Sequence, residues 1–150
     1  MKVFLTGGTG MVGRAIGPLL LDRGDEVLCL TREPAGARGR LPAGVEILGG
    51  DATGPGDWQD RLAGCDGVIN LAGTPIAEGL WTGKKKQLIR RSRLATTENI
   101  VKALAGSDKP VVLASASAVG YYGDRGDEAL GEAAESGQGF LARLAVEWEH

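Results

Sequence analysis

Three glycines at a spacing of three residues follow the first apolar run of the chain, and they constrain its fold more than any other feature. The segment reads VFLTGGTGMVGRAI, with Gly7, Gly10 and Gly13 between a strand-like stretch and a helix-like one. Gly7 permits a tight turn, Gly10 lets a ligand approach the backbone closely, and Gly13 lets the helix lie against the sheet. The pattern predicts a strand–turn–helix unit that binds phosphate groups, and a glycine-rich turn without a ligand is the alternative.

Apolar strand-like runs alternate with helix-like segments along the rest of the chain. We expect strands at residues 2–6, 26–31, 45–50, 67–73 and 110–115, and helices at 10–24, 58–62, 84–105 and 140–150. Continuous apolar strands joined by helices favour a parallel sheet that is covered on both faces. Because crossovers are right-handed, the expected fold is α/β, a doubly wound parallel sheet of the Rossmann type with strand order 3-2-1-4-5.

We expect residues 1–150 to form one NAD(P)-binding Rossmann domain. The chain stops inside its last helix, without a cap and without a following strand. A doubly wound domain usually continues beyond such a point, so we expect an N-terminal fragment whose C-terminal, substrate-binding part is absent.

Two of the expected helices carry apolar residues at helical spacing. In the first helix these are Val12, Ile16, Leu19 and Leu20, and in the long helix they are Leu88, Leu94, Ile100, Val101 and Leu104. We expect these positions to be buried against the sheet. Pro18 is expected to kink the first helix, because it lacks an N–H group and crowds the carbonyl of Arg14.

Composition argues against several classes of partner. Hydrophobic residues make up 43% of the chain and charged residues 24%, and the net charge is −2. This balance favours no nucleic-acid partner, and we expect no membrane partner because no apolar run reaches about 18 residues. The basic segment 84–93 is interpreted as a solvated helix face. The oligomeric state is not predicted.

Two cysteines and one histidine limit the redox and metal chemistry. Cys29 lies in an apolar run and Cys65 near an expected helix end, so we expect two reduced thiols and a cytoplasmic location. His150 is the only histidine, which excludes a histidine-based metal site or catalytic triad within these residues. We expect no metal.

The end of the second strand bears on which dinucleotide is bound. Sites for NAD usually place Asp or Glu about 20 residues beyond the glycines, where the carboxylate meets the ribose hydroxyls. Here Arg32 occupies that place, and a guanidinium can bind a 2′-phosphate through two charge-assisted hydrogen bonds. We therefore expect NADP, with NAD possible because Glu33 is adjacent. The alternative for Arg32 is a solvated side chain at the start of a loop.

Other residues at strand ends fit the same ligand. Asp51 follows the third strand and could accept a hydrogen bond from an adenine amino group, or could only cap a helix. The segment NLAG, residues 70–73, ends the fourth strand with small residues where a cofactor could pass, or could be only turn chemistry. The expected cofactor-binding residues up to this point are Gly7, Thr9, Gly10, Met11, Val12, Gly13, Thr31, Arg32, Asp51, Leu71, Ala72 and Gly73.

Six segments together resemble the extended short-chain dehydrogenase/reductase superfamily, of the NAD-dependent epimerase/dehydratase kind. They are TGGTGMVG, LTR, DGVINLAG, WTGKKKQLIRRSRLATT, SASAVGYYGDRGDE and FLARLAVEWE. They are similar to an atypical subgroup often labelled "epimerase family protein", or by inheritance "cell division inhibitor". Members of that subgroup are about twice as long, and their C-terminal half carries much of the substrate site, which supports the fragment interpretation.

The resemblance implies a catalytic serine but not the usual tyrosine–lysine pair. Ser117 matches the serine that polarises a substrate hydroxyl or carbonyl, with Ser115 as the alternative. Typical members carry Tyr-x-x-x-Lys on the next helix, and those two places are Gly139 and Arg143 here. Arg143 could hold a ribose, but an arginine does not deprotonate in proteins. The subgroup also lacks the pair.

Two tyrosines just after the serine are candidates to replace the missing acid or base. A free phenol has a pKa of about 10, so Tyr121 or Tyr122 would need a nearby cation to act at neutral pH. Packing of the loop is the plainer interpretation for each. Trp81 is expected to pack a loop or cover the nicotinamide. The subgroup typically reads Arg-Trp-Thr there, and Leu80 in place of the arginine weakens any anion-binding role.

Two functions follow from these residues. The first is an NADP(H)-dependent oxidoreductase or epimerase that acts on an unknown small molecule with an atypical acid or base. The second is a dinucleotide-binding sensor or regulatory protein without hydride chemistry, which the missing Tyr–Lys pair favours. They differ in whether bound NADPH is consumed.

Overall fold

A five-stranded parallel sheet forms the centre of the larger of two units in the structure. The computed structural model describes residues 1–150, which divide into the units Met1–Ser115 and Ala116–His150. In chain order the first unit contains β1 (Lys2–Thr6), α1 (Met11–Asp22), β2 (Glu26–Thr31), α2 (Pro34–Ala37), β3 (Val45–Gly49), α3 (Trp58–Ala63), β4 (Gly67–Asn70), α4 (Gly83–Ala105) and β5 (Val112–Ser115). The order β3-β2-β1-β4-β5, with every neighbouring pair parallel, confirms the predicted doubly wound topology.

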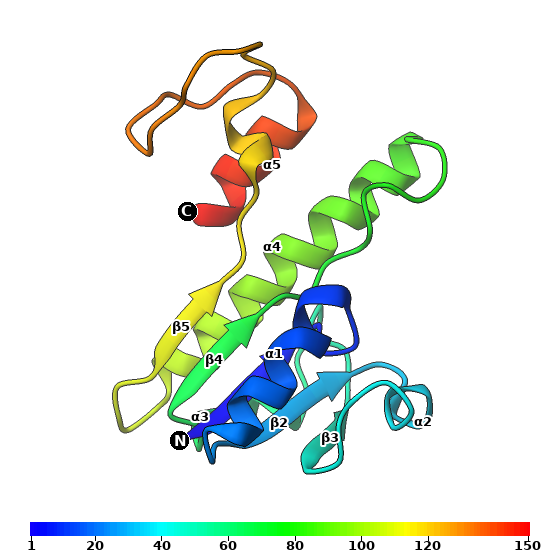
Figure 1. Cartoon of the computed structure of the whole chain (residues 1–150), viewed down its shortest axis with the longest axis vertical. Helices are drawn as coiled ribbons and strands as arrows, with labels where there is room; N and C mark the ends of the chain where they lie inside the picture. The colour runs from blue at the N-terminus through cyan, green and yellow to red at the C-terminus, as the bar shows by residue number, and fades with distance from the viewer. The chain divides into compact units, whose positions relative to one another are not determined.

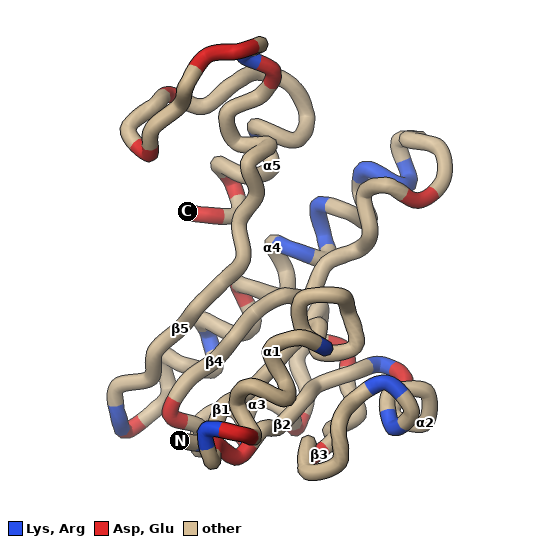
Figure 2. The backbone as a smooth tube through the Cα atoms, viewed as in Figure 1, with Lys and Arg blue, Asp and Glu red and all other residues tan.

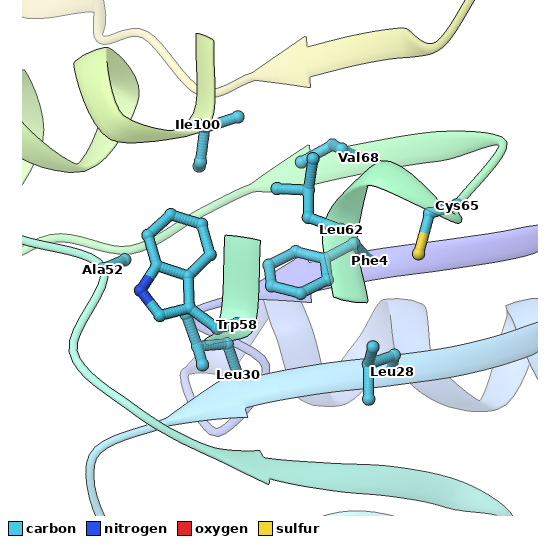
Figure 3. Close-up of a cluster of buried hydrophobic side chains, with 9 residues drawn as sticks. All are labelled: Phe4, Leu28, Leu30, Ala52, Trp58, Leu62, Cys65, Val68 and Ile100. Atoms are coloured by element: carbon cyan, nitrogen blue, oxygen red, sulfur yellow. The ribbon is translucent and has the colours of Figure 1, made fainter. Parts of the chain in front are cut away.

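Helices cover both faces of this sheet, with α1 on one face and α4 on the other (Figure 1). On the α3 and α4 side, Phe4 and Val68 from neighbouring strands pack with Trp58, Leu62 and Ile100 (Figure 3). The rings of Phe4 and Trp58 lie with their centroids 6.0 Å apart. Because successive strand residues point to opposite faces, the intervening strand residues form a second core with α1.

The second core consists of Val3, Leu5 and Val27 from the strands and Leu20 from α1. Leu5 pairs in register with Cys29 on β2 and is fully buried. Residues at the carboxyl end of β1 are thus fixed from both faces, which holds the turn that follows them.

The prediction of which helix residues are buried was wrong in part. In α1 the buried residues are Gly13, Gly17 and Leu20, so Val12 and Leu19 lie off that face and are exposed. A face of two glycines lets the α1 backbone lie close to its neighbours, and this close approach rotates the larger apolar residues outward. The helix is continuous through Pro18; the kink stays a prediction.

The long helix α4 shows the same kind of difference. Its buried residues are Ile89, Thr96 and Ile100, whereas Leu88 is 48% and Val101 49% exposed. The positions 89, 96 and 100 share one helical face, so Leu88 and Val101, each adjacent to one of them in sequence, point away from it. Leu94 and Leu104 are partly buried, as expected.

One short helix lies where the sequence predicted a loop, and one predicted strand is shorter than expected. The helix α2 occupies part of the glycine- and proline-punctuated segment 32–44, and it begins with Pro34, a residue suited to the first helical position. Strand β4 ends at Asn70 and not at Gly73, so the three residues that follow belong to the loop.

The second unit contains a 3-10 turn, η1 (Val119–Tyr122), and a helix, α5 (Phe140–Glu149). The backbone N–H of Gly137 donates to the carbonyl of Tyr121 at 2.8 Å, which ties the intervening loop to the turn. The two tyrosine rings meet edge to face with centroids 5.1 Å apart. No helix in either unit is both long enough and apolar enough to cross a membrane.

Candidate functional site

A cleft of about 520 Å³ opens at the carboxyl ends of the strands of the first unit. It lies where the strand order reverses, since β2 and β4 flank β1, and ligands of open α/β sheets bind at such a switch point. The lining residues come from the glycine loop (Thr6, Gly7, Thr9, Gly10), the β2 end and α2 (Leu30–Glu33, Gly36, Ala37, Arg40), the β3 end (Gly50–Thr53), the loop after β4 (Leu71–Pro75, Glu78) and α4 (Ser92, Thr96).

The glycine loop is packed so tightly that two of its glycines admit no side chain. Gly7 has φ +68°, and a Cβ there would lie 2.6 Å from the carbonyl carbon of Leu71. A Cβ on Gly13 would lie 2.5 Å from the carbonyl oxygen of Gly7. Both contacts are with backbone, which has little freedom to move aside. The first and third glycines therefore hold β1, α1 and the loop after β4 together.

The second glycine leaves the start of α1 open to the cleft. Gly10 is exposed and is the N-cap of α1, and its N–H donates to the carbonyl of Gly7 at 3.0 Å. No side chain caps this helix end, and its first turn carries no acidic residue. The amide groups and the partial positive charge of a helix N-terminus attract an anion. This end of α1 is thus suited to a phosphate group.

Gly8 is a third constrained glycine, which the sequence interpretation missed. A Cβ on Gly8 would lie 2.5 Å from the Cys29 sulfur, so this thiol sits directly beneath the glycine loop. Burial raises the pKa of the Cys29 thiol, against the opposing effect of the Gly8 backbone. The thiol is neutral and acts as part of the packing.

A polar network centred on the buried Thr6 and Asn70 connects the ends of β1, β4 and β5. The Thr6 hydroxyl donates to Asn70 Oδ1 at 2.7 Å and accepts from the N–H groups of Leu71 and Ala72 at 3.2 Å. The Asn70 amide donates to Ser115 Oγ at 3.0 Å and also to Thr97 on α4 at 3.1 Å. Thr6 and Asn70 are almost completely buried. These bonds fix the loop that forms the cleft wall after β4.

Two arginines line the cleft where β2 ends. Arg32 lies there as predicted, and Arg40, just beyond α2, is a second cation that the sequence interpretation missed. Both are exposed, as is Glu33, whose N–H donates to the Thr31 hydroxyl at 3.2 Å. The β2 side of the cleft therefore presents two guanidinium groups and one carboxylate.

Asp51 lies across from these arginines at the end of β3. Its Oδ1 accepts from both the N–H and the hydroxyl of Thr53 at 2.9 Å, so it closes its own turn. Partial burial, the largest single influence, raises the pKa of Asp51, but the two Thr53 hydrogen bonds and the charges of Arg32 and Arg91 outweigh it and lower the net pKa. The carboxylate is ionised at neutral pH and remains able to accept a hydrogen bond.

The predicted cofactor residues separate into three groups. Those that line the cleft are Gly7, Thr9, Gly10, Thr31, Arg32, Asp51, Leu71, Ala72 and Gly73. Met11, Val12 and Gly13 lie in the first turn of α1 but do not line it. Arg143 belongs to α5 in the second unit. Residues that line the cleft and were not predicted include Thr6, Arg40, Ser92 and Thr96.

The predicted catalytic residues all lie in the second unit. Ser117 donates its hydroxyl to the carboxylate of Glu149, and Tyr121 and Tyr122 form the end of η1. Ser115, the alternative serine, ends β5 in the first unit and accepts from Asn70. Ser115, in the same unit as the cleft, does not line it. The catalytic roles of these four residues stay predictions.

A family model described as "NAD dependent epimerase/dehydratase family" matches residues 3–140. The chain belongs to this family. The membership confirms the resemblance inferred from the sequence segments. Epimerase family protein Mb2239 of Mycobacterium bovis is 36% identical over 147 residues, which cover 98% of this chain and 46% of the relative. The chain thus spans about half the length of this curated relative.

Solved structures show the same fold. The crystal structure of human epimerase family protein SDR39U1 with NADPH superposes with a TM-score of 0.77 at 28% identity, over 99% of this chain and 48% of that one. MoeE5 in complex with UDP-glucose and NAD gives a TM-score of 0.78 at 23% identity, over 99% of this chain and 47% of that one. At that lower identity the similarity concerns the fold alone.

Proposed function

We propose that the cleft binds NADP(H), and that the chain is the nucleotide-binding part of an oxidoreductase or epimerase acting on a small molecule. The observation that carries the proposal is the joint presence in one cleft of the uncapped α1 N-terminus and of Arg32 and Arg40. The helix N-terminus suits a pyrophosphate, and the two arginines suit a third phosphate, the one on the ribose 2′-oxygen. The NADPH-bound human relative supports the same cofactor.

The cleft accommodates the two halves of the nucleotide on opposite sides of β1. With the pyrophosphate at the α1 N-terminus, the adenosine half lies over β2 and β3, near Arg32 and Asp51. The nicotinamide half then lies toward the loop after β4, because β4 is on the other side of β1. When bound, the nicotinamide would supply the hydride donor or acceptor. Leu71, Ala72 and Gly73 offer it small or apolar contacts.

Preference for NADP over NAD follows from charge on the β2 side. A 2′-phosphate would gain charge-assisted hydrogen bonds from Arg32 and an attractive charge from Arg40, at the cost of repulsion from Glu33. One such bond contributes about 1.5–3 kcal/mol, which corresponds to about 10- to 100-fold in affinity. Arg32 and Arg40 attract the 2′-phosphate, whereas Glu33 and the ionised Asp51 repel it, so the preference rests on the direct hydrogen bonds from Arg32.

For the chemical step, Ser117 is the proposed group that polarises a substrate hydroxyl or carbonyl, with Tyr121 or Tyr122 as acid or base. The usual tyrosine position holds Gly139, which has no side chain, and the usual lysine position holds Arg143. The second candidate function, a dinucleotide-binding sensor or regulator without hydride chemistry, is favoured by this same observation.

Calorimetric titration of the chain with NADPH and NADH tests the binding proposal. Arg32→Glu is expected to weaken NADPH binding at least tenfold and to change NADH binding much less, because only NADPH carries the 2′-phosphate. Arg40→Gln should produce a smaller loss in the same direction. Arg38→Glu is the matched control, since Arg38 is exposed in the same segment but does not line the cleft.

Equal losses for NADPH and NADH in Arg32→Glu would contradict a phosphate-binding role. Failure of the folded wild-type chain to bind either nucleotide would overturn the cofactor proposal for this chain. To separate the two candidate functions, NADPH oxidation is followed with a panel of small carbonyl compounds, using the protein that contains this chain. Turnover that Ser117→Ala abolishes while NADPH affinity is retained supports an enzyme; binding without turnover favours a sensor.

A further inference from the structure

Thr74, in the loop after β4, is attached to α4 through both of its backbone polar groups. Its N–H donates to Ser92 Oγ at 2.9 Å, and its carbonyl accepts from Arg93 Nη1 at 3.2 Å. The two side chains are adjacent in sequence on α4, 18 and 19 residues beyond Thr74. Because both the donor and the acceptor are used, the peptide planes on either side of Thr74 have little freedom to rotate.

The two side chains are themselves anchored to the backbone of one buried residue of α4, Ile89. Ser92 Oγ donates to the carbonyl of Ile89 at 3.0 Å, and Arg93 Nη1 donates to the same carbonyl at 3.1 Å. Ile89 is fully buried. Burial also lowers the pKa of the Arg93 guanidinium, although it remains charged. The attachment therefore connects the loop to the packed core and not to a mobile surface.

Arg93 also covers Gly73, the residue before Thr74. A Cβ on Gly73 would lie 3.1 Å from Arg93 Cζ and from one of its terminal nitrogens. A half-buried guanidinium held by two carbonyls has little room to withdraw. Gly73 and Arg93 thus fit each other, and a side chain at position 73 would displace the guanidinium or the loop.

This attachment lies on the β4 side of the cleft, whereas Arg32 and Arg40 line its β2 side. Gly73, Thr74, Pro75 and Ser92 line the cleft beyond β4. The figures show basic residues gathered along the amino-terminal half of α4, the half that carries Arg93 (Figure 2). In the proposed binding mode, on which this inference rests, the loop after β4 receives the nicotinamide half of the nucleotide.

We propose that Ser92 and Arg93 are positioning residues that hold residues 73–75 in the conformation that receives the nicotinamide half of NADP(H). They act through the backbone of the loop. The adenosine half binds on the other side of β1 and does not depend on them. The affinity for the whole nucleotide should therefore depend on Ser92 and Arg93, and the affinity for its adenosine 2′-phosphate part should not.

The test compares two probes, NADPH and adenosine 2′,5′-bisphosphate, by calorimetric titration of the chain. Ser92→Ala and Arg93→Met should each weaken NADPH binding at least tenfold and change the bisphosphate affinity less than twofold. Gly73→Ala, which changes the other partner of the Gly73–Arg93 contact, should likewise weaken NADPH binding and leave the bisphosphate affinity almost unchanged. Arg93→Lys should recover part of the affinity, since an ammonium can still donate to one carbonyl. Lys102→Met is the control, because Lys102 is exposed on α4 and pairs with Glu98.

Hydrogen exchange of the Thr74 amide gives a second measurement that needs no ligand. Ser92→Ala should accelerate it at least tenfold, while amides of β1 keep their protection.

Equal loss of affinity for both probes would overturn the proposal, because the residues would then support the whole cleft. Unchanged affinity for both would overturn it as well. If the wild-type chain binds neither probe, the proposed cofactor itself is contradicted. If the wild-type chain binds both probes and the variants bind them equally well, only the positioning role of Ser92 and Arg93 is contradicted. Should Arg93→Met not fold, Ser92→Ala and Gly73→Ala decide the outcome.

Discussion

The glycine-loop side of the cleft and its β2–β3 side are built in different ways. The first consists of backbone packed on backbone, at Gly7 and Gly13, and of the buried pair Thr6 and Asn70. The second presents exposed charged side chains, such as Arg32. A change on the first side disturbs the fold together with the ligand site. A change on the second side can alter which nucleotide is preferred and leave the fold intact.

The largest expected effect comes from the tightest backbone contact. Gly13→Ala places a Cβ 2.5 Å from the Gly7 carbonyl oxygen, so α1 must move away from the loop. We expect a loss of about 3 kcal/mol or more in the free energy of unfolding and no detectable NADPH binding. Urea unfolding and calorimetry measure the two effects. Gly17→Ala is the control on the same helix, because its Cβ would meet Pro42 at an ordinary 3.7 Å. A similar loss of stability in Gly17→Ala would contradict the special role of the Gly13 contact.

A smaller effect is expected from the buried polar network. Asn70→Ala leaves the buried Thr6 hydroxyl without its acceptor, and it also removes the donor to the exposed Ser115. Leaving such groups unsatisfied costs about 1–3 kcal/mol, which urea unfolding should detect, and NADPH affinity should fall with it. Ser115→Ala removes only one partner and should cost less than half as much. Unchanged stability in Asn70→Ala would mean that the glycine-loop side of the cleft, like the exposed β2–β3 side, can be altered without cost to the fold.

The smallest effect is expected at Asp51, on the exposed side. Its pKa in the folded chain lies below the ordinary value of 3.8, so the carboxylate stabilises the fold above that pH, and the stabilisation is lost as the pH falls through the folded pKa. Because the side chain is exposed, we expect less than about 1 kcal/mol. Asp51→Asn should therefore lower the unfolding midpoint slightly at neutral pH, and the difference from wild type should disappear in strong acid. A difference that grew in acid would contradict the assigned sign.

The strand order and the glycine loop were predictable because each depends on short-range patterns. Apolar runs alternating with helices leave few chain paths, and the glycine spacing follows directly after a strand. The helix faces were less predictable. Val12 and Leu88 have helical spacing with other apolar residues, yet Gly13 and Ile89 beside them face the core. Close backbone packing at glycines decides how α1 is rotated about its axis. The spacing of apolar residues in the sequence does not indicate this rotation.

The parts of the cleft that were missed come from segments without a local pattern. Arg40 follows a four-residue helix inside a stretch rich in glycine and proline, which is typical of a loop. The bonds from Ser92 and Arg93 to Thr74 depend on how α4 is rotated and placed, and polar residues in the segment 84–93 looked like a solvated face. Tertiary packing, not propensity, places Arg40 and Ser92 at the cleft and Arg93 against the loop after β4.

The thiol of Cys29 beneath Gly8 makes the glycine loop accessible to kinetic measurement. Cys29 and Cys65 are both buried, so an alkylating reagent reaches either one only when the surrounding structure opens. Burial also raises the pKa of each thiol, which lowers its reactivity. Cys65 belongs to the core cluster of Phe4 and Trp58, on the opposite face of the sheet from Leu5 and α1. The two alkylation rates therefore report separately on the opening of the loop and of the core, and a nucleotide bound at the loop would slow the reaction of Cys29 more than that of Cys65.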